Sequence, residues 1–477
     1  MRTLKIFIII AAVMITGCGT IKQVGTPPVV NIPASFTTSP DSPGVNRLSW
    51  KDFFTDQYLI GLINTALKNN LDIKTAIQRV GIARASTRIA NAARLPFVTA
   101  GVSAGIDKYG KYTLNGVGNF DTNLSPNIDR KRKIPTNPTQ DYFIGFRSTW
   151  EADIWGKLKD RKQAAYARYL ASEKGRQWLT TQIVAEVAGM YYELVALDNQ
   201  LRIIQRNIEL QRKGLEVVEA QMAGGRATAL AVKQFTAQVL HTQGAEFEIR
   251  QAIIRTENEL NTLIGRFPTA IVRDTTLLRK PVPEKIQAGI PSEVLLRRPD
   301  IQEAELALLA AKTDIKAARK EFLPSLTINP YVGFNAFKLP LIFQPGSIAA
   351  GAAASLVGPL INRAGIRSGY NIANAEQLQA FYNYQRNILQ GFQEIVTQLQ
   401  LIENFKKSYA LKTSEVRELT EGVTNANELY LAGYASYLEV IVAQGSVLQA
   451  EIEQTNIKKE MFQSIINLFR STGGVWE

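Results

Sequence analysis

The strongest constraint on this chain is an apolar pattern that repeats every seven residues between positions 183 and 222. A straight helix of 3.6 residues per turn does not keep such a stripe on one line, so the helix must supercoil with a partner to bury it. The pattern therefore predicts a long coiled-coil helix. Its members recur at spacings of four and three: Ile183, Val187, Met190, Leu194, Leu197, Leu201, Ile204, Ile208, Gln211, Leu215, Val218 and Met222.

A second segment repeats this seam with more polar members. If the two long helices begin near residues 160 and 366 and end at glycine turns, each holds about 65 residues and spans roughly 100 Å at 1.5 Å per residue. We expect the second seam to be partly hydrated. Its members are Ile388, Phe392, Ile395, Leu399, Ile402, Lys406, Tyr409, Thr413, Val416, Thr420, Val423, Asn427 and Tyr430.

The chain also repeats itself around the glycine turns. Residues 221–232 align with residues 429–440 through the pattern Gly-x-Ala-[Thr/Ser]-x-Leu-x-Val, and each half has an earlier Leu-Pro pair, at 95–96 and 323–324. Such self-similarity indicates two structural repeats. We predict a first repeat over 50–265 with its turn at about 222–228, a linker over 266–291 in the equatorial region, and a second repeat over 292–474 with its turn at about 430–436.

Alternating segments follow each Leu-Pro pair. In the clearest one, Tyr142, Ile144 and Phe146 alternate with Arg147 and its polar neighbours, which is the period-two pattern of a strand with one apolar face. About ten residues suit a tilted crossing of a bilayer. One half of a soluble sandwich is the alternative that this pattern leaves open. The predicted strands are at about 98–107, 142–154, 325–334 and 348–357.

Four strands are too few to close a barrel. No run of 18 apolar residues follows the N-terminal segment, so no transmembrane helix is expected. An open strand edge in lipid leaves backbone groups unpaired, at a cost of several kcal/mol each. We therefore expect the chain to oligomerise. The predicted fold class is mixed: a transmembrane β-barrel joined to a long α-helical coiled-coil barrel, with each repeat in the order helix, β-hairpin, long helix, helix.

The N-terminus has the form of a bacterial export signal. Basic residues precede an apolar run over 6–15, and small residues lead to Cys18, the only cysteine. Residues 15–18 resemble a lipobox, and Gly19 in place of Asp favours sorting to the outer membrane by resemblance to bacterial lipoproteins. We predict a signal peptide over 1–17, lipidation at Cys18 and a lipidated arm over 18–49.

Charge and residue usage exclude several functions. The net charge is +13, but an export signal makes nucleic acid an improbable partner, and the basic residues are spread through the chain. The one local cluster, Arg130 to Lys133, is predicted to be a solvated loop, with contact to anionic lipid headgroups as the alternative. His241 is the only histidine. No phosphate loop or nucleophile elbow occurs, so we predict no enzyme activity, no cofactor and no metal site.

Several motifs resemble the TolC-like outer-membrane efflux family, particularly its lipoprotein branch that serves resistance-nodulation-division pumps. They are Asn69-Asn70-Leu71-Asp72-Ile73, Trp150-Glu151-Ala152-Asp153-Ile154-Trp155-Gly156 and Leu296-Arg297-Arg298-Pro299-Asp300-Ile301. The resemblance implies a homotrimer with a twelve-stranded barrel in the outer membrane, a helical tube across the periplasm, a periplasmic adaptor and an inner-membrane pump. The predicted function is a passive exit duct for small molecules. A duct for type I protein secretion and a periplasmic scaffold without a pore are the alternatives.

The same resemblance implies functional residues at the turns. Family members close their tube near the second turn, so Glu439 is the gate candidate with Tyr434 and Tyr437 as neighbours. Val442 stands where a second acidic residue can occur. Arg298-Pro299-Asp300 is interpreted as a helix start, because Pro suits the first turn and Asp the positive end of the dipole. The adaptor is expected to dock at Gly224, Gly225, Arg226, Ala227, Thr228, Gly433, Ala435 and Ser436.

Overall fold

The computed structural model describes residue 25 and residues 27–36, 50–135, 138–280, 291–359 and 363–474. The signal peptide, Cys18, most of the arm and part of the linker therefore lie outside the described residues. The chain divides into two units. We call Ala83–Arg168 with Ala307–Phe381 the strand unit, to which Met1–Pro28 also belongs, and Val29–Ile82, Tyr169–Leu306 and Tyr382–Glu477 the helical unit.

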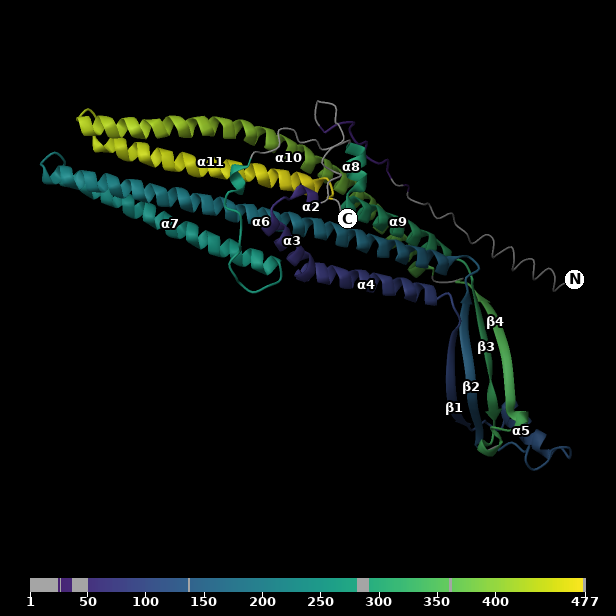
Figure 1. Cartoon of the computed structure of the whole chain (residues 1–477). Coiled ribbons are helices and arrows are strands. Elements are labelled where there is room, and N and C mark those ends of the chain that lie inside the picture. Colours follow the sequence, from purple (N-terminus) through teal and green to yellow (C-terminus); the bar gives the residue numbers. More distant parts are fainter. Residues whose placement is uncertain are drawn as a thin grey trace. The chain divides into compact units, whose positions relative to one another are not determined.

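Two very long helices dominate the element order (Figure 1). They are α6, with 67 residues, and α10, with 69 residues, and each is followed by a turn and a helix of 35 residues. In the described residues, no helix has both the length and the apolar composition for crossing a membrane. The helices are α2 Trp50–Phe53, α3 Gln57–Asn69, α4 Leu71–Ala92, α5 Leu114–Leu124, α6 Lys157–Ala223, α7 Ala229–Leu263, α8 Pro291–Arg297, α9 Pro299–Lys320, α10 Ala364–Ala432 and α11 Tyr437–Ser471.

The shorter helical segments are interrupted between α3 and α4 and, at the helix start predicted from Arg298-Pro299-Asp300, between α8 and α9. Between α3 and α4, Asn70 caps the new helix by accepting a hydrogen bond from the backbone N–H of Ile73 at 2.9 Å. Its amide also donates to the carbonyl of Leu263 at 2.8 Å. Between α8 and α9, Pro299 disfavours the helical conformation at Arg298, so a second helix starts there.

The strand unit contains one antiparallel sheet in the order β1-β2-β3-β4. A lateral row runs Val102–Ile144–Phe334–Ile348 across all four strands, and the next row on the same face runs Ala100–Phe146–Val332–Ala350. Within the described residues, β1 pairs only with β2 and β4 only with β3. Both outer strands therefore keep an unpaired edge. The strands are β1 Phe97–Asp107, β2 Thr139–Ala152, β3 Ser325–Ala336 and β4 Ile348–Val357.

The long helices of the helical unit form a layer in the order α7, α6, α11, α10 (Figure 1). Side-chain contacts establish each neighbouring pair: Gln205 to Glu246 joins α6 to α7, Gln200 to Asn456 joins α6 to α11, and Lys412 to Glu453 joins α10 to α11. Most of the predicted seam positions of α6 are buried, including Ile183, Val187, Leu194, Ile204 and Val218, whereas Met222 at the turn is exposed. At the level of these contacts, α7 and α10 are the outer members of the layer, whereas near the turns residues of all four helices pack in one cluster.

Candidate functional site

The first helical turn joins α6 to α7 and contains five of the residues predicted to dock an adaptor. Gly225 has a φ of 70°, a left-handed value that is strained for residues with a side chain. The backbone N–H of Arg226 donates to the carbonyl of Gln221 at 2.8 Å and closes the helix end. Thr228 caps α7, because its hydroxyl accepts a hydrogen bond from the N–H of Ala231 at 3.2 Å. Gly224 is exposed and Ala227 is partly buried.

The second turn joins α10 to α11 and has the same geometry. Gly433 has a φ of 81°, and the N–H of Tyr434 donates to the carbonyl of Leu429 at 2.9 Å. Ser436 caps α11 in a capping box with Glu439, in which the Ser436 hydroxyl donates to the Glu439 carboxylate at 2.6 Å. Both turns are therefore tight reversals that are fixed by a left-handed glycine and a hydroxyl cap.

The structure brings the two turns together at one end of the helical unit. The buried cluster there contains Val218, Ala231, Phe235 and Val440, from α6, α7 and α11. Ala227 and Tyr437 pack against this cluster, and the hydroxyl of Tyr430 donates to the side chain of Gln221. The residues predicted at the two turns thus form one surface.

The three gate candidates occupy different environments. Tyr434 is exposed, Tyr437 is partly buried against the turn cluster, and Glu439 is exposed. The hydrogen bonds from the side chain and then the backbone of Ser436 lower the pKa of Glu439 below its ordinary value of 4.5. Glu439 therefore stays ionised at neutral pH while it caps α11. Its role as a gate residue stays a prediction.

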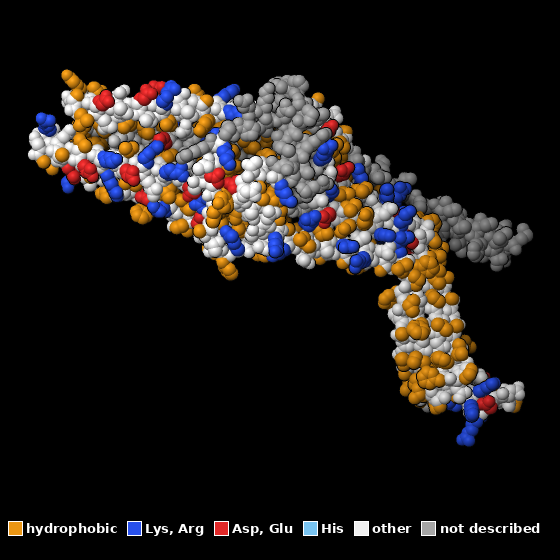
Figure 2. Space-filling model, in the orientation of Figure 1, with side chains coloured by type: hydrophobic (Ala, Val, Ile, Leu, Met, Phe, Trp, Pro, Cys, Tyr) orange, Lys and Arg blue, Asp and Glu red, His pale blue; other side chains and the backbone are white. Residues whose placement is uncertain are grey.

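The two faces of the sheet differ in chemistry. One face carries an apolar hollow of about 590 Å³, which Val102, Phe146, Phe334 and other residues line. The other face has polar rows, in which the guanidinium of Arg147 lies 4.4 Å from the centre of the Phe143 ring. Figure 2 shows that hydrophobic side chains gather over the strands, whereas Lys, Arg, Asp and Glu are frequent over the helices. An apolar face that is exposed on this scale indicates a membrane or protein interface.

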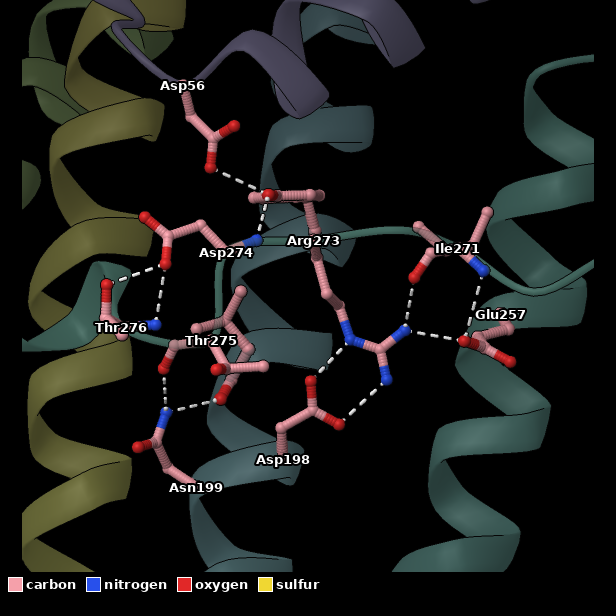
Figure 3. A network of polar contacts seen from close by, with 11 residues as sticks. Asp56, Asp198, Asn199, Glu257, Ile271, Arg273, Asp274, Thr275 and Thr276 are labelled. Atoms are coloured by element: carbon pink, nitrogen blue, oxygen red, sulfur yellow. Dashed lines mark hydrogen bonds and ion pairs between the residues drawn. The ribbon is translucent and has the colours of Figure 1, made fainter.

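A polar network ties the segment after α7 to the long helices (Figure 3). The guanidinium of Arg273 binds the carboxylate of Asp198 on α6, at 2.8 Å from Nη2 to Oδ1, and also contacts Glu257 on α7. Nearby, the hydroxyl of Tyr191 donates to Asp56 at 2.7 Å and accepts from the backbone N–H of Asp274 at 3.0 Å. Sequence reasoning missed this network, because its members are far apart in the chain.

Arg298 is the second feature that sequence reasoning missed. Its side chain is 1% exposed, and it donates to both oxygens of Asp300, at 3.0 and 2.8 Å, and to Glu394 on α10 at 3.1 Å. It also donates to the carbonyl of Ser471 at 2.8 Å, and its guanidinium lies 4.9 Å from the centre of the Trp178 ring. The predicted helix start is present, since α9 begins at Pro299. The Arg298 side chain links the beginning of α9 to α6, α10 and α11.

The described residues contain no group of three or more His, Cys, Asp or Glu side chains that could hold a metal ion. His241 lies on α7, and its side chain is exposed.

Very long helices together with a sheet that has one apolar and one polar face are the features expected of an outer-membrane duct. The chain belongs to the outer membrane efflux protein family, whose model, described as "Outer membrane efflux protein", matches residues 62–266 and 290–474. The predicted family is thereby confirmed. The chain is an outer-membrane component of an efflux system and not an enzyme, and channels of this family work with adaptor and inner-membrane pump partners.

Individual relatives agree with this assignment over 95% or more of the chain. The probable outer membrane lipoprotein SilC of Salmonella typhimurium is 28% identical, with 100% of both chains covered. The pyoverdine export outer membrane protein OpmQ of Pseudomonas putida is 30% identical, with 95% of this chain and 94% of the relative covered. A solved structure of CusC matches with a TM-score of 0.79 at 25% identity and covers 96% of this chain and 100% of that chain.

Proposed function

We propose that three copies of this chain form one duct, in which twelve strands close a barrel in the outer membrane and the long helices form a tube across the periplasm. Small molecules leave the cell through it passively, after an inner-membrane pump has selected them. The observation that carries this proposal is the four-stranded sheet, which has an apolar face and, among the residues that the structure describes, an unpaired edge on both β1 and β4.

Strand closure argues for three copies. In lipid, each unpaired backbone group costs several kcal/mol, so β1 of one copy must pair with β4 of the next. Two copies would give eight strands, and the interior of a barrel of that size is just wide enough for side chains to fill. Twelve strands leave an aqueous path. The polar face with Arg147 would then line the lumen, and the face with Val102 and Phe146 would contact lipid.

The helical layer supports the same closure. Its outer helices are α7 and α10, so a ring forms when α7 of one copy meets α10 of the next. Leu240, Phe247 and Ile254 recur at seven-residue intervals on α7 and are exposed, with Phe247 70% exposed. Such a stripe requires a helical partner. Helix α7 begins and helix α10 ends at the surface that the two helical turns form. Leu411 on α10 is exposed, and its distance in residues from the turn lies between those of Phe247 and Ile254 on α7.

We propose that the turn surface has two roles in the trimer. Glu439 carboxylates from three copies converge near the axis and restrict the opening, with Tyr434 and Tyr437 beside them. The adaptor docks on both turns, at the exposed residues Gly224, Gly225, Arg226, Thr228, Gly433 and Ser436 and at the partly buried Ala227 and Ala435. The adaptor and pump are those of a resistance-nodulation-division system, as the quoted sequence motifs imply.

Anchoring to the outer membrane is proposed to involve Cys18. The residues before it resemble a lipobox, and the similar protein SilC is named as a probable outer membrane lipoprotein. Acyl chains on Cys18 would add about 0.8 kcal/mol of membrane affinity per buried CH₂ group.

The gate is tested by the conductance of the purified protein in planar bilayers. We expect wild type to form channels and Glu439→Ala to raise their conductance, because three like charges no longer order water and cations at the opening. Ser436→Ala is the matched control, since it removes the capping hydroxyl and keeps the Glu439 charge. Equal conductance of Glu439→Ala and wild type would exclude Glu439 from the gate. An equal rise in both variants would assign the effect to helix capping.

A further inference from the structure

The connection between β1 and β2 lies at the end of the sheet opposite to the helices of the strand unit. It contains the helix α5 and the basic cluster Arg130–Lys133 that the sequence singles out (Figure 1). Residues 108–135 contain six Lys or Arg residues and two Asp residues. Figure 2 shows basic side chains gathered at this end of the strands, directly beyond the apolar surface of the sheet.

Side-chain hydrogen bonds fix the described part of this connection. The amide of Asn123 on α5 donates to the carbonyl of Ile134 at 2.8 Å and accepts from its N–H at 2.9 Å. The carboxylate of Asp129 accepts from the backbone N–H groups of Lys131 and Arg132, at 2.9 and 3.0 Å. The ammonium of Lys338, between β3 and β4, donates to the carbonyl of Lys131 at 3.4 Å. The basic cluster therefore lies in a turn whose backbone is fixed by side-chain hydrogen bonds.

The charges of this turn are largely uncompensated. The Nε atom of Arg132 lies 3.8 Å from Oδ2 of Asp129. Exposed ion pairs of this kind contribute little to stability. Among the described residues, no ion pair joins Arg130, Lys131 or Lys133 to a carboxylate, and all three side chains are exposed. Exposed cations at the boundary of an apolar surface are complementary to the phosphates of lipid headgroups.

Helix α5 adds apolar side chains beside these cations. Leu114 is 90% exposed, and Phe120 and Leu124 are also exposed. A helix that combines exposed apolar residues with neighbouring basic residues is typical of segments that lie in the membrane interface. Strand ends in a barrel reach the headgroup level, so the place of this connection in the fold agrees with its composition.

We propose that α5 and the turn Arg130–Lys133 form a docking surface for anionic lipid headgroups in the outer leaflet. Arg130, Lys131 and Lys133 bind phosphate groups there, while Leu114 and Leu124 contact the acyl boundary. This inference rests on the proposed function, because it requires the sheet to lie in a membrane. The surface would hold the barrel at a fixed depth and rotation in the bilayer.

The test uses full-length trimers in nanodiscs of phosphatidylcholine alone or of phosphatidylcholine with an equal amount of phosphatidylglycerol. We expect trypsin to cleave after residues 130–133 about tenfold more slowly in the anionic discs. Inorganic phosphate added to the phosphatidylcholine discs should not protect the turn. Equal cleavage in both discs would overturn the proposal, and so would equal protection by free phosphate, which would indicate a site for free anions.

Matched variants measure lipid binding directly. Native mass spectrometry should find fewer retained phosphatidylglycerol molecules on Arg130→Gln/Lys131→Gln/Lys133→Gln than on wild type. The control Lys312→Gln/Lys316→Gln/Arg319→Gln removes three exposed charges from α9 and should retain the wild-type number. Equal retention by all three proteins would overturn the proposal. Failure of wild type to insert as a trimer would overturn the proposed function as well, whereas inserted trimers without lipid selectivity would overturn only this inference.

Discussion

Val102→Arg should remove the assembled channel from the outer membrane, whereas Ser103→Arg should leave it in place. Val102 suits this test because its side chain is 78% exposed on the apolar face and lies in the middle of β1, far from both ends of the strand. A charged residue on the lipid face near the bilayer midplane costs about 2–4 kcal/mol. The trimer would incur this cost three times. Ser103 is the next residue and points to the polar face, opposite Phe143.

The measurement is the amount of oligomer in isolated outer membranes, read on gels of unheated samples, together with the drug or solute tolerance of the cells. Val102→Arg should lower both, and Ser103→Arg should lower neither. Normal assembly of Val102→Arg would contradict the assignment of this face to lipid. An equal loss in both variants would show that β1 tolerates no arginine on either face, so the two faces would not be distinguished.

Arg298→Ala should be the most destabilising single change in the helical unit. It leaves Asp300 and Glu394 without their shared cation and the carbonyl of Ser471 without its donor. Removal of one partner from a buried ion pair typically costs about 3–5 kcal/mol. Arg298→Lys should recover only part of this, because an ammonium cannot reproduce the bidentate contact with Asp300 and the contact with the Trp178 ring together.

The adjacent exposed residue provides the control for Arg298. Arg297→Ala should change the stability by no more than about 0.5 kcal/mol, as surface substitutions usually do. The measurement is thermal unfolding of the full-length protein in detergent, followed by the helical circular dichroism signal. If Arg298→Ala and Arg297→Ala unfold at the same temperature, the buried contacts of Arg298 do not stabilise the protein.

Local patterns were the parts of the fold that the sequence could predict. The heptad seam specifies α6 and α10, because the burial of a stripe depends only on spacing along one helix. Apolar and polar residues alternate in the strands for a similar reason, because the face that a strand residue occupies depends only on its spacing along that strand. The segment predicted at 142–154 is β2 from Thr139 to Ala152, and the helices predicted to start near 160 and 366 start at Lys157 and Ala364. Gln211, the polar member of the first seam, is fully buried and donates from its amide to Asn207 at 2.9 Å.

Contacts between distant residues could not be predicted. The Arg-Arg-Pro-Asp motif indicates a helix start, but nothing near it indicates that Arg298 binds Glu394 and the carbonyl of Ser471. Arg273 and Asp198 likewise meet only in the folded chain. Helix α5 was not predicted, since its glycines and asparagines favour a loop; it begins at a local cap, where the Thr113 hydroxyl accepts from the N–H of Gly116 at 3.1 Å.

The capping box at Glu439 shows how one residue can have a local and an assembled role. In the single chain, its carboxylate is used to cap α11. The proposed gate needs the same group in three copies near an axis. The sequence motif locates Glu439 at the start of a helix after a glycine turn, and both roles require that location. The capping role and the gate role of Glu439 can therefore be distinguished only by measurements on the assembled channel.

The most direct test of the shared wall is a disulfide between neighbouring copies. Phe247 lies eighteen residues into α7 and Ser414 eighteen residues before the end of α10, so both are at the same level above the turns. At this level α7 contacts α6, α6 contacts α11 and α11 contacts α10, so we expect no bond between α7 and α10 within one chain. The double variant Phe247→Cys/Ser414→Cys should oxidise to three covalently linked chains that still conduct, and neither single variant should do so. Only monomers after oxidation, from protein that inserts and conducts, would contradict the account.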